Sequence, residues 1–360
     1  MTDTPPDAPR LKPRALAVGA TAALAVATAL HLVMIPPGGS PTAHELAEGR
    51  TPAGEPLRRV ANTPVENPLD ADRAMGYLRD LCAIGPRISG TPGMQRQQQL
   101  VSEHFKELGA EVEFQPFTYP HPLTGKRVSL ANLIVRWRPD AERRVLLCAH
   151  YDTRPLPDQD PDRAARQSGV FVGANDGASG VAVLMELGHL MAERFEEQAS
   201  DEDFGVDFVL FDAEELVYRE RDPYFLGSQY FASRYKNRRP DEWSYEAAVL
   251  LDMVGDADLR LPYEANSYLN RQSRPIAQEV WAVAERLGVD EFVPKLGPQV
   301  SDDHLALRRY GGIRAIDIID FDYPHWHTRA DTPDKCSGES LAKVGWVVWE
   351  WLLERAGEGE

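Results

Sequence analysis

Cysteine is scarce in this sequence, and basic residues are outnumbered by acidic ones. The three cysteines, Cys82, Cys148 and Cys336, contain no Cys-x-x-Cys pair, which predicts neither a disulfide framework nor a cysteine zinc cluster. Lys and Arg number 39 against 56 Asp and Glu, so the formal charge is −17. A nucleic-acid partner is therefore not expected, because binding to phosphate requires a basic surface. Cys148 lies in the apolar run 145–149 and is expected in the core.

One long apolar run stands near the N-terminus. Residues 15–35 are uncharged and mostly apolar, and three basic residues between positions 10 and 14 precede them. The run predicts that residues 1–35 are a signal anchor or a cleaved signal peptide. Its length favours an anchor, the small residues at 25–29 are compatible with cleavage, and a buried soluble helix is a third reading. We expect the remainder to be exported, either anchored in the membrane facing the periplasm or exterior, or secreted.

The rest of the chain divides into a linker and one folded domain. Residues 36–67 are rich in Pro, Gly, Thr and Glu without an apolar period, which predicts a flexible linker. Within 68–360, extended segments are predicted at 110–116, 130–137, 144–151, 206–212, 247–253 and 313–319, and helices at 70–82, 94–108, 181–194, 276–287 and 340–354. Near-continuous apolar strands between helices predict a mixed α/β fold, with a twisted sheet that is parallel in its centre and has helices on both faces.

Polar residues cluster near the predicted strand ends. In an open α/β sheet, ligands bind at the carboxyl ends of the strands. Five segments with His, Asp or Glu fall there: 149–152, 173–180, 212–215, 251–252 and 323–327. Each alone has an ordinary explanation, such as a polar loop, an Asp-Gly turn or a helix start. Their joint occurrence predicts a metal site whose nitrogen and oxygen ligands suit Zn²⁺.

The adjacent acids Glu214 and Glu215 can take different roles at a metal site. They closely follow an apolar strand, and Asp176 lies in a glycine-rich loop that leads into a helix. One carboxylate of an adjacent pair can bind a metal while the other takes and returns a proton. The sequence thus predicts that, of Glu214 and Glu215, one binds the metal and the other carries a proton.

These five segments, in this order, resemble the zinc peptidase clan that contains bacterial aminopeptidases and the glutaminyl-peptide cyclotransferases. The resemblance covers about residues 68–356 and implies a zinc aminopeptidase-like fold. In the two-zinc aminopeptidases, Glu214 would be the general base and Asp152 would orient the imidazole of His150. The implied ligands of the two zinc ions are His150, Asp176 as the bridge, Glu215, Asp252 and His327.

Two further motifs are similar to the cyclotransferase branch: Asp303 within Ser301-Asp-Asp-His304, and Trp326 directly before His327. On spacing alone, the first would be a helix-capping turn and the second a core residue. The branch implies one zinc, bound by Asp176, Glu215 and His327, that polarises the γ-carbonyl of an N-terminal glutamine, and it makes Glu214 the proton carrier. It assigns Asp252 to the substrate amine and Asp303 to the support of Glu214, and it places Trp326 and His304 in the pocket.

The sequence departs from the animal cyclotransferases after the acid pair. Those enzymes have an aromatic pocket residue there, whereas the aligned part of 216–222 is charged, and Tyr218 is a possible substitute. In the one-zinc reading His150 supports the site without binding metal.

Three functions follow from the resemblance. The first is a cyclotransferase that converts N-terminal glutamine of peptides or proteins to pyroglutamate and releases ammonia. The second is a two-zinc aminopeptidase, which also acts on peptide N-termini. The third is a non-catalytic binding domain, although such domains usually lose ligands and none is missing here. His150 and Asp252 are compatible with both enzymes, so ligand identity alone does not choose between one zinc and two.

Overall fold

The computed structural model describes residues 66–197, 204–238 and 243–357. The predicted N-terminal span and all but the last residues of the predicted linker lie outside these ranges, so both remain predictions. Among the described residues, no helix combines the length and apolar character that a membrane crossing needs.

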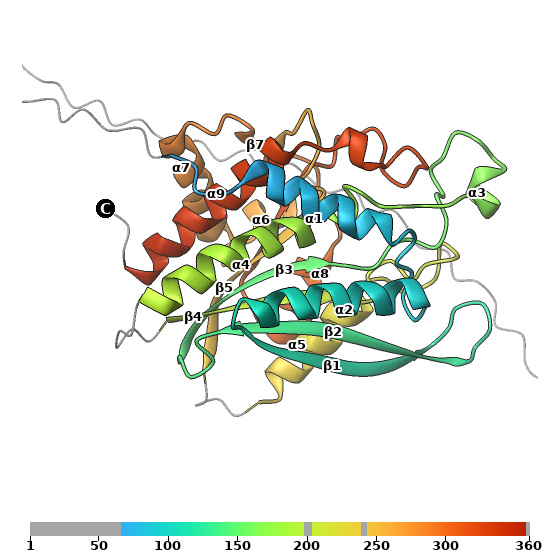
Figure 1. The fold of residues 1–360 in the computed structure, drawn as a ribbon, viewed down its shortest axis with the longest axis horizontal. Coiled ribbons are helices and arrows are strands. Elements are labelled where there is room, and N and C mark those ends of the chain that lie inside the picture. The colour runs from blue at the N-terminus through green and yellow to red at the C-terminus, as the bar shows by residue number, and fades with distance from the viewer. Residues whose placement is uncertain (1–65, 198–203, 239–242, 358–360) are drawn as a thin grey trace, which may run out of the picture. The chain divides into compact units, whose positions relative to one another are not determined.

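A six-stranded mixed sheet forms the centre of the fold (Figure 1). Its spatial order is β1-β2-β4-β3-β5-β8. The strands β4, β3, β5 and β8 run parallel to one another, β2 is antiparallel to β4, and β1 is antiparallel to β2. The strands are β1 (Glu111–Pro120), β2 (Arg127–Trp137), β3 (Arg143–His150), β4 (Phe204–Phe211), β5 (Ser244–Asp252) and β8 (Ala315–Ile319). The predicted mixed α/β fold with a centrally parallel sheet is therefore confirmed.

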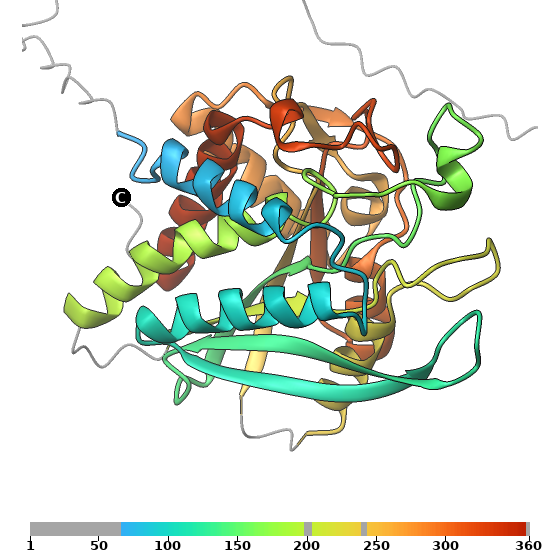
Figure 2. The ribbon, with the colours of Figure 1, turned by 45° about the vertical axis from the view of Figure 1, so that its right-hand side comes forward.

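Helices cover both faces of this sheet (Figure 2). One face packs against α1 (Ala71–Ala83), α2 (Pro92–Glu107), α4 (Ser179–Glu197), α7 (Arg274–Leu287) and α9 (Gly338–Ala356). The other packs against α5 (Leu226–Lys236) and the π-helical turn Leu307–Gly311, which continues the short α8 (Asp303–Ala306). The smaller elements are α3 (Ala165–Ser168), α6 (Ala265–Leu269), the 3₁₀ turn Pro333–Lys335, and the parallel strands β6 (Leu261–Tyr263) and β7 (Phe292–Leu296).

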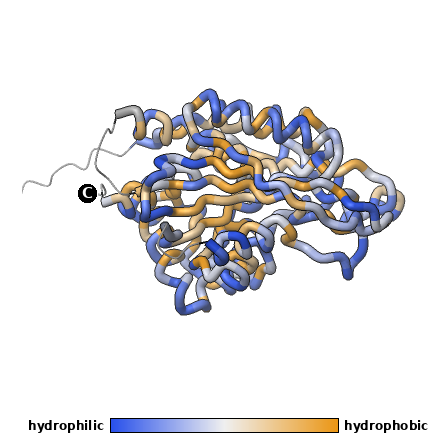
Figure 3. Tube along the Cα trace, turned by 90° about the horizontal axis from the view of Figure 1, so that it is seen from below, coloured by the Kyte–Doolittle hydropathy of each residue, from blue (hydrophilic) through white to orange (hydrophobic). Residues whose placement is uncertain are grey.

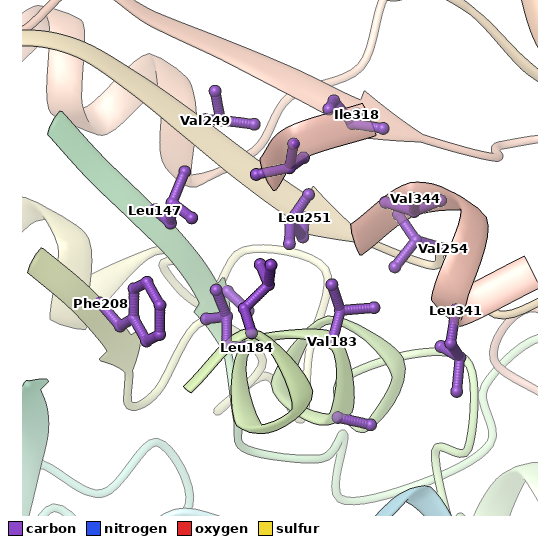
Figure 4. Close-up of a cluster of buried hydrophobic side chains, with 14 of the residues drawn as sticks. Leu147, Val183, Leu184, Phe208, Val249, Leu251, Val254, Ile318, Leu341 and Val344 are labelled. Carbon is purple, nitrogen blue, oxygen red and sulfur yellow. The ribbon is translucent and has the colours of Figure 1, made fainter. Parts of the chain in front are cut away.

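The central strands are apolar on both sides because both sides are covered. Every residue of β4 is buried, as is every residue of β3 after the first. Leu147 packs into the core on the α4 face, whereas its neighbours Leu146 and Cys148 point into the opposite core. Figure 4 shows the first of these cores, where Leu147 and Phe208 face Leu184 of α4. Burying each such side chain stabilises the fold by about 1.5–3 kcal/mol, and Figure 3 shows the apolar residues concentrated in these strands.

Several local predictions are confirmed, and several elements were missed. Pro275 lies in the first turn of α7, and all three cysteines are free. The sequence reading missed α5, α6, β6 and β7. The last three have only three to five residues, too few for an apolar period to emerge. The helix α5 has a weak apolar face because it packs through small residues such as Gly227 and Ser228.

Gly180 allows the first turn of α4 to lie directly against the ends of β3 and β5. A Cβ atom on Gly180 would stand 2.2 Å from the carbonyl oxygen of Leu251 and 2.9 Å from the Cβ of Ala149. We expect Gly180→Ala to lower the free energy of unfolding by about 1–3 kcal/mol, measured by urea denaturation. Gly76→Ala in α1 is the matched control, since nothing lies within 4 Å of its added Cβ, and it should stabilise by about 0.5–1 kcal/mol. Equal unfolding energies for the two variants would contradict this packing.

Candidate active site

The carboxyl ends of the parallel strands bring the predicted site residues together. His150 is the last residue of β3, and Asp252 is the last residue of β5. Glu214 and Glu215 follow β4 within four residues, and His327 lies in the loop after β8. All five predicted segments therefore converge at one edge of the sheet, as expected for an α/β fold.

Two groups of potential metal ligands share Asp176. Asp176, Glu215 and His327 form one group, and His150, Asp176 and Asp252 form the other. In the first, His327 Nε2 lies 2.8 Å from Glu215 Oε1 and 3.4 Å from Asp176 Oδ2. In the second, His150 Nε2 lies 3.2 Å from Asp252 Oδ1 and 3.3 Å from Asp176 Oδ1. Asp176 is thus placed where a carboxylate could bridge two ions.

The first group fits a zinc ion by its chemistry and by its unsatisfied atoms. The buried oxygens Asp176 Oδ2 and Glu215 Oε2 have no hydrogen-bond partner in the protein. Unpaired buried carboxylate oxygens are costly, so a cation between them would stabilise the site. One imidazole and two carboxylates form a ligand set that zinc accepts. The fit supports zinc, whereas the number of ions is left open by the two overlapping groups.

Unusual backbone conformations concentrate around these residues. Ala213, Phe225, Met253 and His327 all have positive φ angles, between 47° and 60°. Such angles are uncommon outside glycine and cost on the order of 1 kcal/mol each. Ala213 and Met253 turn the chain just after β4 and β5, which directs the following loops across the sheet edge. Local strain of this kind gathers at functional sites because the surrounding structure imposes it.

An arginine and an aspartate that the sequence reading did not single out support the first metal group. Asp158 Oδ1 lies 3.0 Å from His327 Nδ1. Arg154 donates to Asp158 Oδ2 at 2.7 Å and to Glu215 Oε1 at 3.2 Å. Arg154 also donates to the hydroxyl of Tyr224 at 3.1 Å. These contacts fix the rotamers of Glu215 and His327, and no motif spacing pointed to them.

Asp152 lies beside His150, with its Oδ1 3.8 Å from His150 Nδ1. Its role in orienting that imidazole stays a prediction. The carboxylate also accepts hydrogen bonds from the backbone N–H groups of Glu214 and Glu215, both at 3.0 Å. Asp152 therefore holds the backbone of the acid pair, because β3 and β4 are neighbours and their following loops meet.

Asp331 holds the Asp176 loop in the same manner. It accepts from the backbone N–H groups of Asn175 at 2.8 Å and Asp176 at 3.1 Å, and from the hydroxyl of Tyr323 at 2.8 Å. Burial and the charge of Asp176 together raise the pKa of Asp331 to about 7, against the hydrogen bonds that it accepts. The sequence reading missed this residue, since a lone aspartate after the His327 segment has no distinguishing pattern.

A cavity of about 240 Å³ opens beside the metal groups. Glu214, Asp252 and Trp326 line it, as the sequence predicted. The Trp326 ring stacks on His327, with 3.8 Å between ring centroids and 23° between planes. Further lining comes from aromatic, aliphatic and polar residues that were not predicted, namely Tyr224, Phe225, Gln299, Val300, Ser301, Asp302, Ile319 and Phe321. We refer to this space as the first cavity.

Two predicted pocket residues lie elsewhere. His304 is fully buried, with Nε2 3.3 Å from Glu264 and Nδ1 3.6 Å from Asp317, and it does not line the first cavity. The start of α8 directs it into the interior toward α6 and β8. Tyr218 lines a neighbouring cavity, while Tyr224 and Phe225 supply the aromatic wall near Glu214. The loop after the acid pair is long enough to place its aromatic residues further along the chain than expected.

Glu214 lies in an acidic, buried environment. Burial raises its pKa well above the usual range, the charges of Glu215, Asp302 and Asp303 add to this, and His150 opposes it. Asp303 is fully buried, accepts a hydrogen bond from Ser228 Oγ, and has a pKa raised by burial to about 7. Asp303 thus acts on Glu214 through charge. A carboxyl group with a raised pKa is suited to general acid and base chemistry near neutral pH.

Comparison with known proteins identifies the family. The model for Peptidase family M28 matches residues 132–352. This chain belongs to Peptidase family M28.

Proteins similar to this chain include glutaminyl-peptide cyclotransferases and exopeptidases. The glutaminyl-peptide cyclotransferase of Bos taurus is 24% identical over 290 residues, which cover 74% of this chain and 78% of that protein. The crystal structure of Fimbriiglobus ruber glutaminyl cyclase is 42% identical with a TM-score of 0.74, covering 79% of this chain and 95% of that one. A Zn-dependent exopeptidase from Parabacteroides distasonis is 30% identical with a TM-score of 0.71, covering 79% and 98%. Solved proteins with either kind of name therefore share this fold.

The contact between Asp158 and His327 gives a prediction about metal affinity. We expect Asp158→Asn to weaken zinc binding by about 10- to 100-fold, because a carboxylate that orients a ligand imidazole also strengthens it. Competition with a chromogenic chelator would measure the affinity. Asp334→Asn is the control, since this exposed acid pairs with Lys335 away from the site. Equal zinc affinity in the two variants would show that Asp158 does not support the metal.

Proposed function

We propose that this M28 protein is a glutaminyl-peptide cyclotransferase, which converts the N-terminal glutamine of peptides or proteins to pyroglutamate and releases ammonia. The observation that carries the proposal is the 42% identity with Fimbriiglobus ruber glutaminyl cyclase across 95% of that chain. The Zn-dependent exopeptidase is more distant, at 30%. The matching name of the bovine relative adds independent support.

Asp176, Glu215 and His327 are the residues we assign to the metal. Their ligand atoms lie close together, and two of the carboxylate oxygens accept no hydrogen bond from the protein. Zinc bound there would supply a Lewis acid for the amide carbonyl of the substrate. Arg154 and Asp158 hold Glu215 and His327 in position for this role.

Glu214 is assigned the transfer of a proton. Its carboxylate removes a proton from the substrate α-amino group, whose nitrogen then attacks the γ-carbonyl carbon and forms the ring C–N bond. The bond from that carbon to the amide nitrogen breaks, and Glu214 delivers the proton to the departing ammonia. The raised pKa of Glu214 makes it a better base for the first transfer and keeps the proton available for the second.

The remaining groups position the substrate. Asp252 lines the first cavity and would accept a hydrogen bond from the α-amino group. His150 lies 3.2 Å from Asp252 and would keep its carboxylate oriented. Trp326 offers an apolar surface for the methylene groups of glutamine, and the charge of Asp303 helps to maintain the basicity of Glu214.

A two-zinc aminopeptidase is the second candidate. It is favoured by the group of His150, Asp176 and Asp252, which adjoins the first group through a shared carboxylate. If these residues held two zinc ions, the ions would supply Lewis acidity for the amide carbonyl oxygen and activate the attacking water during hydrolysis. The exopeptidase relative shares the fold at nearly full length.

Substrate and metal measurements together separate these functions. We expect the zinc-loaded protein to convert Gln-peptides to products lighter by one ammonia, without shortening, and to leave Leu- and Ala-peptides intact. Mass spectrometry follows the products, and elemental analysis should find one zinc per chain. Release of N-terminal residues together with two zinc ions per chain would establish the aminopeptidase instead.

The role of Glu214 predicts a large effect of a small substitution. Glu214→Gln keeps the size of the side chain but cannot exchange the proton, so we expect kcat to fall by about 10²- to 10⁴-fold. Bound zinc and the unfolding midpoint should stay near those of the parent protein. Glu107→Gln, at an exposed position of α2, should leave kcat unchanged. Full turnover by Glu214→Gln on both substrate types would remove Glu214 from the mechanism.

A further inference from the structure

A second cavity of about 430 Å³ adjoins the first. Tyr224, Trp326 and His327 line both cavities and form the wall between them. The outer walls come from the loop after the acid pair, including Tyr218 and Arg219, and from the segment that begins at Arg154 and extends to α3. Figure 2 shows this loop and α3 at the same end of the sheet. Of these outer residues, the mechanism proposed above uses only Arg154 and Asp158, which hold Glu215 and His327.

The second cavity carries charge that the protein itself does not neutralise. Arg154 is compensated, because it pairs with Asp158 and Glu215. Arg166 donates to the backbone carbonyl of Asp160 at 2.7 Å, and Arg219 donates to that of Pro122 at 3.4 Å. Within the described ranges, neither guanidinium lies within ion-pair distance of a carboxylate.

One acidic group, Glu220, stands beside these two arginines on the lining. It is exposed and forms no ion pair with a described residue. Arg166, Arg219 and Glu220 together therefore give this lining a net charge of +1, whereas the whole chain has a formal charge of −17. A local positive region on an acidic protein selects for anionic groups that the rest of the surface repels.

The turn that carries Arg219 is held in place. Asp222 accepts hydrogen bonds from the backbone N–H groups of Tyr218 at 3.0 Å and Arg219 at 2.8 Å. The guanidinium is thus presented from a fixed backbone. Guanidinium groups bind carboxylates through paired N–H donors, which makes a carboxylate the matching ligand.

We propose that the second cavity binds the residues that follow the N-terminal glutamine, and that Arg166 and Arg219 favour a carboxylate there. This rests on the proposed function, which places glutamine in the first cavity. An extended peptide advances about 3.3 Å per residue. Its next residues therefore pass Tyr224 and Trp326, which line both cavities, and enter the second cavity. The preferred substrates are peptides with Asp or Glu at the second or third position.

Two sources of carboxylate need to be separated, namely an acidic side chain and the C-terminus of a short peptide. The substrates are Gln-Ala-Ala, Gln-Glu-Ala, Gln-Ala-Glu and Gln-Lys-Ala with amidated C-termini, together with Gln-Ala-Ala as the free acid. We expect kcat/KM to be about two- to fivefold higher for the glutamate peptides than for amidated Gln-Ala-Ala, mainly through KM. The lysine peptide should be the poorest, and added salt should reduce the differences.

Variants test whether the arginines are responsible. The double variant Arg166→Gln/Arg219→Gln should bring the ratio between glutamate and alanine peptides to about one, while amidated Gln-Ala-Ala is cyclised as before. Glu220→Gln should raise the ratio, because it removes the opposing charge. Arg271→Gln, an exposed arginine that lines neither cavity, should leave it unchanged.

Each outcome decides a different point. Equal kcat/KM for all the peptides, the free acid included, or a ratio that the double variant does not change, overturns the proposal while the proposed function stands. A gain confined to the free acid, and lost in the double variant, supports the arginine pair with the peptide C-terminus as its carboxylate. Absence of cyclisation with every peptide overturns the proposed function, and this proposal with it.

Discussion

The site depends on holding several carboxylates close together in a buried place. Asp176 lies between two imidazoles and beside Glu215, and its pKa is raised to about 6 by burial and by the charge of Glu215. Carboxylates in such an arrangement repel one another unless a cation or a proton separates them. The unpaired oxygens of Asp176 and Glu215 show that the protein alone does not complete this balance. A metal ion is the simplest group that would.

The protein frame has to oppose this repulsion in order to keep the site assembled. Asp152 and Asp331 each bind two consecutive backbone N–H groups in a loop that carries metal-group residues. Arg154 ties Glu215 to Asp158. The close approach of α4 at Gly180 lets the Asp176 loop reach the strand ends. Most of the supporting contacts are thus charge-assisted hydrogen bonds to buried groups, where each is stronger than on the surface.

Proteins named as a glutaminyl cyclase and as a Zn-dependent exopeptidase share this fold, so the fold does not by itself select a reaction. The residues around Glu214 and those that line the two cavities are the ones that can select a reaction and a substrate. Asp302 and Asp303 make the environment of Glu214 more acidic, while Trp326 narrows the first cavity above His327. The second cavity adds arginines to the path of the substrate chain. We therefore assign the type of reaction to the surroundings of Glu214 and the preference among peptides to the second cavity, at the same edge of the sheet.

The sequence by itself determined the fold class and the residues of both metal groups. Apolar runs indicate strands covered on both faces, and polar residues at the ends of parallel strands converge, so the five segments could be named in advance. The resemblance to the zinc peptidase clan then selected His150, Asp176, Glu215, Asp252 and His327 within them. The tertiary structure alone decided what supports them. Asp158, Asp331 and Arg154 come from loops that meet only after folding, and a single Asp or Arg in a loop has no period or spacing that identifies it. For the same reason the structure, and not the Asp-Asp-His motif, showed that His304 points into the interior: the direction of a side chain at a short helix depends on which elements pack around it.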